Sequence, residues 1–403
     1  MKPLRGVRVA DFSWAIAGPS GTMMLAMMGA EVIKVENRQR IDLIRKLSSV
    51  LGWEDQPDPE RSFQFNLINL NKRGLTLDLS RPKAVELAKK LVSISDVVVE
   101  NFSPGVMDRL GLEYETLRQV KPDIIMLSVS AAGATGPERR ALGYAPIFHS
   151  VSGMGYLTGY PDSPPGYIRS PIDCNVASMG ALAVMSALVQ RQRTGQGQYI
   201  DLSAREAISH LIGHVFTQAV LTGKEPQREG NYQEEMAPHD CYPCRGDDRW
   251  VSIAVGNDEE WQALVWAMGS PAWAGEQRFG SSTARLLHRE ELDRRIGEWT
   301  RDRDPYEVTS VLQGAGVAAF PSLSGKDVST DPHLKAREGQ VEVEHPTLGE
   351  QVVFGPPWKF SQTHPQVNSP APLLGQHNEY VLKDLLNLSS QEIADLESTG
   401  VLS

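Results

Sequence analysis

Short apolar runs alternate with helix-like segments through the first 130 residues of the chain. The run "VRVADFS" (7–13) reads like a buried strand, the glycine-opened "GPSGTMMLAMMGA" (18–30) like a helix, and "EVIKVEN" (31–37) like a second strand. The alternation continues through "GLTLDLS" (74–80), "PKAVELAKKLVSI" (82–94), "DVVVENF" (96–102), a helical stretch near 105–119, and "DIIMLSVS" (123–130). This order favours a parallel sheet that is covered by helices on both faces.

The character of the sequence changes near Gly223, where a polar, turn-rich stretch precedes the strand-like "RWVSIAVG" (249–256) and a mostly helical segment, 258–315. We therefore expect an α/β protein of two domains, which suits 403 residues. Residues 1–222 would form most of a large domain with a Rossmann-like parallel sheet, and 225–320 a smaller α+β domain. Residues 321–403 would be a linker and C-terminal helices that return to the large domain.

The composition limits which kinds of binding partner and which cellular compartment we expect for this protein. A formal net charge of −10 argues against a nucleic-acid-binding surface. Three cysteines are too few for a disulfide framework, which favours a reducing compartment. The N-terminus has no signal-like region, and no apolar run approaches the roughly 20 residues of a membrane helix. We expect a soluble, cytoplasmic protein that contacts neither membrane nor nucleic acid.

One carboxylate, Asp173, stands between a proline and a long apolar run in "SPIDCNVASMGALAVMSALV". Aspartate often begins a helix, because its side chain accepts a bond from a free backbone N–H, and we expect a helix from Asp173 to about Gln192. A carboxylate at the positive end of a helix also stays ionised, as a nucleophile must. The residues alone leave both roles open.

Other motifs are weaker. The N-terminal segment has the order of a dinucleotide-binding unit: a strand, a glycine turn, a helix, and an acidic residue, Glu36, at the end of the second strand. This order suggests a nicotinamide dehydrogenase. Its glycines, Gly18 and Gly21, do not form the G-x-G-x-x-G motif of such sites. Several basic residues that follow strands could contact an anion at the sheet edge: Arg38, Arg40, Arg45, Lys72, Arg73, Arg109, Arg139 and Arg140.

The "HDCYPC" stretch offers three possible metal ligands, His239, Cys241 and Cys244. A structural zinc site uses four, and the chain has no second CxxC or His pair, so we expect no metal site. His149 and His210 have no evident partner in the sequence and are expected to be packed or surface histidines.

Taken in order, the motifs resemble those of the class III CoA-transferases over the whole chain. The resemblance is carried by "DFSWAIAGPSGTMMLAMMGAEVIKVEN", "NLNKRGLTLDLS", "DVVVENFSPGVMDRLGLEYETL", "LTGYPDSPP", "GQGQYIDLS", "YPCRGDDRWVSIAV" and "HNEYVLKDLLNLS". It implies interlocked homodimers, each subunit threaded through the other.

The resemblance also assigns residues. The catalytic aspartate of the family falls on Asp173, and coenzyme A contacts fall on Ile16, Ala17, Leu77, Asp78, Asn101, Phe102 and Arg109. Arg38 is offset by one place from the family's basic position for the adenosine phosphate. We place Tyr144 and His149 near the substrate. A CoA thioester would be a substrate, and no cofactor would be bound permanently.

Two departures bear on specificity. Formyl-CoA transferases carry a glutamine at the place of Ile16, a glutamate near Ala145, and a glycine run in the small domain that this chain lacks. A pocket without those polar groups suits a bulkier or less polar acid than formate or oxalate. The racemases of the superfamily need a His-Asp pair where this chain has "GYAPIF", with Tyr144 and Ala145.

The expected reaction is transfer of CoA from an acyl-CoA to a free acid through an aspartyl-CoA thioester on Asp173. Cys174 would point about 100° away from Asp173 on a helix, so a thiol mechanism is not expected. Two alternatives stay open: an acyl-CoA racemase or isomerase, and a non-catalytic CoA-binding partner subunit. The sequence identifies neither the two acids nor the oxyanion donors, for which the candidates are backbone N–H groups of "AIAGPS" (15–20) and "AAGATG" (131–136).

Overall fold

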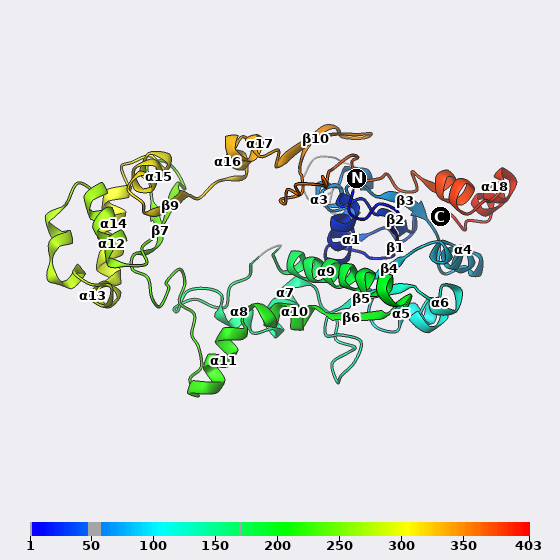
Figure 1. Cartoon of the computed structure of the whole chain (residues 1–403), viewed down its shortest axis with the longest axis horizontal. Helices are drawn as coiled ribbons and strands as arrows, with labels where there is room; N and C mark the ends of the chain where they lie inside the picture. The colour runs from blue at the N-terminus through cyan, green and yellow to red at the C-terminus, as the bar shows by residue number, and fades with distance from the viewer. Residues whose placement is uncertain (1, 47–57, 169–170) are drawn as a thin grey trace. The chain divides into compact units, whose positions relative to one another are not determined.

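The computed structural model describes residues 2–46, 58–168 and 171–403. The chain forms two compact units (Figure 1). Unit 1 contains Met1–Gly155, Tyr167–Lys224 and His333–Ser403, and unit 2 contains Tyr156–Gly166 and Glu225–Pro332. Each unit thus combines segments that are distant in the sequence.

A six-stranded sheet organises unit 1, in the order β3-β2-β1-β4-β5-β6, and every neighbouring pair is parallel. The strands are β1 (Arg8–Asp11), β2 (Glu31–Glu36), β3 (Arg73–Thr76), β4 (Val97–Glu100), β5 (Ile125–Ser130) and β6 (Tyr199–Ser203). The direction of the strand order reverses between β1 and β4, and ligands of open α/β sheets bind outside the carboxyl ends of strands at such a point. The α/β fold with a parallel sheet is confirmed.

Helices cover both faces of this sheet, because its strands are apolar on both sides. Along β4, Val98 packs into one core cluster, while Val97 and Val99 pack into the other. The first cluster includes α4 (Pro82–Ser93), α5 (Val106–Leu110), α6 (Tyr114–Val120), a π-helical segment (Tyr380–Leu385) and α18 (Ser390–Ser398). The second includes α1 (Ala17–Met27), α7 (Ala145–Val151), α9 (Pro171–Thr194) and α10 (Ala204–Leu211).

Helix α9 begins two residues earlier than expected, so Asp173 is its third residue and not its N-cap. Pro171 explains the difference, because proline fits the first turn of a helix. By length and composition α9 could cross a membrane, contrary to our expectation from the sequence. Its most apolar stretch is 44% buried, however, and the helix packs on α1, α7, α10 and β5 in unit 1.

Several short elements of unit 1 were not anticipated. Segment 131–172, whose sequence shows no sustained periodicity, contains α7 and α8 (Met154–Leu157), and the return segment contains a hairpin of β10 (Gln340–His345) and β11 (Gly349–Phe354). Periodicity over so few residues gives little signal. The remaining elements of the unit are α2 (Leu43–Lys46), a 3₁₀ turn (Pro59–Arg61), α3 (Phe63–Ile68), α11 (Gly213–Thr222) and α17 (Pro332–Ala336), which begins at the last residue of unit 2.

Unit 2 is built on an antiparallel sheet of β7 (His239–Pro243), β8 (Trp250–Ala254) and β9 (Ala318–Pro321). Its core contains Trp261, Phe279 and Tyr242. The helices are α12 (Asp258–Ala267), α13 (Ser282–Leu287), α14 (Arg289–Thr300), α15 (Pro305–Gly314) and α16 (Gly325–Ser329), with 3₁₀ turns at Ala272–Gly275 and Gln277–Phe279. The segment 156–166 is bonded to this unit, since Gly230 N–H donates to the Gly159 carbonyl at 2.9 Å.

Candidate active site

A cavity of about 840 Å³ opens in unit 1 at the carboxyl ends of the strands. It lies at the point where the strand order reverses, since its wall includes Phe12 and Trp14 after β1 and Asn101 after β4. Nine of the residues singled out from the sequence line it: Ile16, Ala17, Leu77, Asp78, Asn101, Phe102, Arg109, Tyr144 and Asp173. Arg38 and His149 do not.

Charged side chains are concentrated in one part of the cavity wall. Where β2, β3 and β4 end, the wall carries Asn37, Arg40, Asp78, Ser80 and Arg109, interspersed with apolar residues. Where α9 begins, the wall comes from elements that pack on α9, and apart from Asp173 it is mostly apolar or aromatic: Ala17, Val129, Ala145, Phe148 and Ala204, with Tyr144 and Tyr167. We call this second part the apolar end of the cavity.

Asp173 lies in the wall at the apolar end, half-buried in the first turn of α9. Within residues 2–46, 58–168 and 171–403, no side chain or backbone group pairs with its carboxylate. Burial raises the pKa of Asp173 to about 6. The carboxylate is still mostly ionised at pH 7, and it is more basic than an exposed aspartate, which suits a nucleophile.

Cys174 is less suited to attack. Partial burial and the neighbouring Asp173 charge raise the pKa of its thiol. The thiolate is the reactive form of cysteine, and raising the pKa lowers its population at neutral pH.

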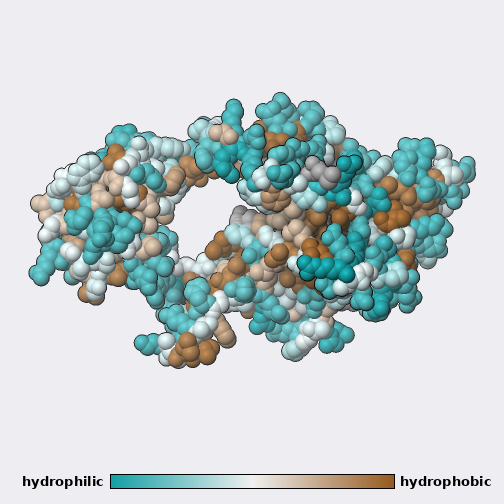
Figure 2. Space-filling view, in the orientation of Figure 1, coloured by the Kyte–Doolittle hydropathy of each residue, from teal (hydrophilic) through white to brown (hydrophobic). Residues whose placement is uncertain are grey.

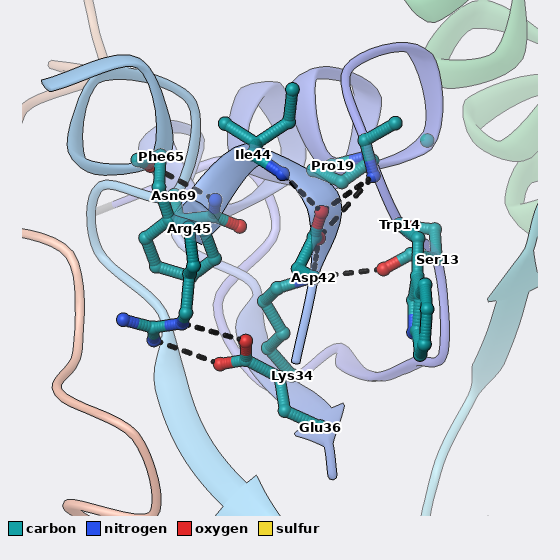
Figure 3. Close-up of polar contacts among 12 residues, drawn as sticks. Ser13, Trp14, Pro19, Lys34, Glu36, Asp42, Ile44, Arg45, Phe65 and Asn69 are labelled. Carbon is teal, nitrogen blue, oxygen red and sulfur yellow. Dashed lines mark hydrogen bonds and ion pairs between the residues drawn. The ribbon is translucent and has the colours of Figure 1, made fainter. Parts of the chain in front are cut away.

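Three side chains hold the backbone of the turn that leads from β1 into α1, and two of them, Lys34 and Asp42, are labelled in Figure 3. Lys34 Nζ donates to the Ser13 carbonyl at 2.8 Å. The Asn101 side chain accepts from Trp14 N–H at 2.6 Å and donates to the Trp14 carbonyl at 2.7 Å. Both carboxylate oxygens of Asp42 accept from Ala15 N–H at 3.2 Å. Ala15 and the next two residues line the cavity.

The turn beyond β4 is held in a similar way. The Glu100 carboxylate accepts from Phe102 N–H at 2.8 Å, and the Phe102 ring meets Trp14 edge-on at 6.0 Å between centroids. Burial raises the pKa of Glu100 to about 7.

The turn after β3 is held by Asp78. Its carboxylate accepts from Ser80 N–H at 3.2 Å and pairs with Arg81 at 3.0 Å.

Among the basic candidates, Arg40 lines the cavity and lies over Trp14 at 5.4 Å from the ring centroid. Asn37 supports it by accepting from Arg40 N–H at 2.7 Å. The Arg38 guanidinium instead lies against Gly375, where an added Cβ would be 2.7 Å away. Arg40 is therefore better placed for a ligand anion than Arg38.

Two of the scattered basic residues cannot act as anion contacts in the cavity. Arg45 is buried and pairs with Glu36 at 2.8 Å, and Lys72 is buried and pairs with Asp11 at 3.0 Å. These pairs neutralise charges inside the unit, so this expectation from the sequence was wrong. Arg139 and Arg140 line a second cavity of about 550 Å³ with Glu100 and Tyr199.

Tyr144 is 67% exposed and lines the cavity, whereas His149 is buried behind the wall. The His149 ring meets Tyr167, which lines the cavity, edge-on at 5.5 Å between centroids. Tyr167 and Trp14 were missed from the sequence. Single aromatic residues in loops carry no periodic signal that would have identified them.

His239 and Cys241 lie on β7 in unit 2, and Cys244 follows that strand. Within the described residues, no group of three or more His, Cys, Asp or Glu side chains is arranged to hold a metal ion.

Comparison with known proteins places these features in a family. The family described as CoA-transferase family III matches residues 4–378. The chain is 35% identical to a succinyl-CoA–D-citramalate CoA-transferase of Chloroflexus aurantiacus, over 100% of this chain and 98% of that one. It is 31% identical to a formyl-CoA:oxalate CoA-transferase of Rhodopseudomonas palustris, over 100% of this chain and 97% of that one. A crystal structure of a CaiB/BaiF family protein from Brucella suis matches with a TM-score of 0.86 at 31% identity, over 95% of this chain and 99% of that one.

Proposed function

The chain belongs to CoA-transferase family III, and from this premise we propose that it transfers coenzyme A from an acyl-CoA to a free carboxylic acid through Asp173. The resemblance expected from the sequence is thereby confirmed. One observation carries the proposal: a carboxylate without a described partner lines the same cavity as the residues matched to coenzyme A.

The steps follow from the chemistry of a carboxylate nucleophile. Asp173 attacks the thioester carbonyl, which gives a mixed anhydride and a CoA thiolate. The thiolate then attacks the aspartyl carbonyl, which gives an aspartyl-CoA thioester and releases the donor acid. The acceptor acid enters and the steps run in reverse. Because the thioester energy is conserved, the reaction consumes no other energy source, and division into covalent steps lowers each barrier.

Each tetrahedral intermediate needs donors for its oxyanion. In the loop 131–136, Ala134 N–H donates to the Asp201 carboxylate at 2.9 Å and 3.0 Å, so it is not free. Among the described residues, the backbone N–H groups of Ile16 and Ala17 have no hydrogen-bond partner, and both residues line the cavity. These observations make the N–H groups of Ile16 and Ala17 candidate oxyanion donors and remove that of Ala134.

The cavity wall supports transfer over racemisation. The place of the racemase His-Asp pair is held by Tyr144 and Ala145, and both line the cavity. A tyrosine and an alanine cannot together act as the acid–base pair that exchanges an α-proton at neutral pH.

The polarity of the wall supports an acid bulkier or less polar than formate or oxalate. Ile16 and Ala145 stand in the cavity where formyl-CoA transferases have polar groups, and Phe148 adds a ring. Succinyl-CoA is our candidate donor, in keeping with the name of the Chloroflexus relative. Coenzyme A is then a substrate and not a resident cofactor, and we place the reaction in the cytoplasm.

We further expect the enzyme to act as an interlocked homodimer. No residue of α11 is buried, and its exposed side chains include Phe216 at 69%, Val220 at 67% and Leu221 at 80%. Figure 2 shows this helix as an apolar cluster at the lower edge of the view. Such a surface is costly in water and is covered in stable oligomers. Light scattering that gives a monomer at micromolar concentration would contradict the dimer.

Mass spectrometry of the protein incubated with a panel of acyl-CoAs tests the proposal. Effective donors should add coenzyme A to the peptide that contains Asp173, and hydroxylamine or borohydride should trap the adduct. Cys174→Ala should load equally, and Asp173→Asn should not load. Loading elsewhere, or incorporation of solvent deuterium at the α-carbon without an acceptor acid, would reject this mechanism.

A further inference from the structure

A buried carboxylate outside the cavity controls the shape of the cavity wall. Asp42 is 1% exposed and does not line the cavity. Its oxygens accept from Ala15 N–H at 3.2 Å and from Ile44 N–H at 3.0 Å, and Lys34 Nζ lies 3.7 Å away. Figure 3 shows this carboxylate between the start of α2 and the turn after β1.

The backbone at Ala15 needs such support. Ala15 has a φ of 56°, in the left-handed region that residues with a Cβ seldom occupy. Its neighbours Ser13 and Trp14 are fixed by Lys34 and Asn101, so Asp42 supplies the last of these fixed points before Ile16 and Ala17. A strained residue persists only where its surroundings hold it in place.

We infer that Asp42 is a positioning residue of the transfer reaction, which holds Ala15 in its left-handed conformation and so sets Ile16 and Ala17 in the wall of the cavity that Asp173 also lines. The inference rests on the proposed function, because it assigns these two residues to the reacting end of the ligand. Asp42 acts through the backbone and does not touch the substrate.

The test compares two carboxylates of similar local role. Asp96 also accepts a backbone N–H, from Arg8 at 2.8 Å, and pairs with a cation, Arg191, at 2.7 Å. It lies at the amino end of β4, the opposite edge of the sheet from the cavity. The Asp96–Arg191 pair is only partly buried, so Asp96→Asn controls for the loss of an ion pair and a backbone acceptor far from the cavity.

Asp42→Asn should lower kcat by about 10²-fold, because small displacements of positioning groups have effects of that size. KM for the acyl-CoA should change little, since Arg40, Asp78 and Arg109 stay in place. Asp96→Asn should leave kcat near that of the wild type. A kcat for Asp42→Asn equal to that of Asp96→Asn would overturn the inference.

A second comparison in the same experiment uses Ala15→Gly. Glycine adopts a positive φ without strain, so the double variant Asp42→Asn/Ala15→Gly should recover a large part of the lost kcat. A loss that Ala15→Gly does not relieve would also overturn the inference, because Asp42 would not then act through Ala15. Should Asp42→Asn alone fail to fold, Ala15→Gly is compared with and without Asp42→Asn. Similar kcat values are expected, and a loss of about 10²-fold on adding Asp42→Asn to Ala15→Gly would reject the inference.

The outcome is separable from that of the proposed function. If Asp173→Asn retains turnover, the aspartyl mechanism fails whatever Asp42 does. If Asp173→Asn is inactive and Asp42→Asn is fully active, only the positioning role fails.

Discussion

Two carboxylates of unit 1 are buried in opposite circumstances. Asp11, at the end of β1, is completely buried and bonded to Lys72 at 3.0 Å, to Ser13 N–H at 3.0 Å and to Thr22 Oγ1 at 2.6 Å. Burial alone would raise its pKa, but Lys72, Lys34 and two hydroxyl groups lower it to about 2. Asp173, in the first turn of α9, has no described partner, and burial raises its pKa to about 6.

The difference in partners suits one carboxylate to a structural role and the other to a chemical role. A buried carboxylate whose oxygens are all engaged fixes the backbone around it and cannot attack a carbonyl. A buried carboxylate without partners lowers the stability of the folded protein, and such a group is retained where it has a function. The partnered aspartates, Asp11 and Asp42, hold the turn after β1, and Asp173, which has no partner among the described residues, lines the cavity.

The largest expected effect is on turnover. Asp173→Asn should lower kcat by about 10⁴-fold or more, because removal of a covalent nucleophile has effects of that order. Free CoA should still bind, since the residues matched to it are untouched. Steady-state transfer assays and calorimetry with CoA measure the two quantities. Activity close to that of the wild type would remove Asp173 from the mechanism.

Asp11→Asn should have the largest effect on stability. It leaves the Lys72 ammonium buried without its counter-charge, which costs about 4 kcal/mol of unfolding free energy. The folded pKa of Asp11 lies below its unfolded value, so the stability it supplies is present at neutral pH and is lost as pH falls towards 2. Urea unfolding measures the change, and an unaltered midpoint would contradict the contrast between the two aspartates.

Asp173→Asn should change stability in the opposite direction. The folded pKa of Asp173 is raised, so its ionised form destabilises the folded protein above about pH 6. Replacement by a neutral amide should add about 2 kcal/mol at pH 7. The gain should shrink between pH 6 and pH 4, where the wild-type carboxyl becomes protonated in the folded state. Parallel urea titrations at pH 7 and pH 4.5 would show it, and a less stable variant at pH 7 would contradict it.

The pH dependence of loading should be the smallest of these effects. Attack requires the ionised carboxylate, so the rate at which an acyl-CoA loads Asp173 should fall about tenfold per pH unit below about pH 6. Single-turnover loading is the right measurement, because it avoids ionisation of the acceptor acid. A rate that stays constant down to pH 4 would mean that bound ligand lowers this pKa, or that another group attacks.

Much of the large sheet could be predicted from the sequence. Elements within the regular strand–helix alternation, such as β2 and α4, were indicated by their apolar patterns. Elements outside that alternation, including α7, α8 and the β10–β11 hairpin, were not anticipated. Their stability comes from packing and pairing with distant residues, which a local pattern does not record.

The candidate site divides in the same way. Sequence motifs brought Asp173, Tyr144 and the residues matched to coenzyme A to attention, and nine of them line one cavity. The sequence also suggested Arg45 and Lys72 as anion contacts, yet both are buried in ion pairs. Whether a basic residue meets solvent or a buried carboxylate depends on how distant segments pack.

By itself, the sequence determined the alternation of strands and helices, the order of the motifs and the aspartate before the apolar helix, because these depend on residue type and spacing. Only the tertiary structure decided that Asp173 has no described partner while Asp11 and Asp42 have several. The physical reason is that the pKa of a carboxyl is set by the charges, donors and solvent within a few ångströms, and those come from segments far apart in the chain.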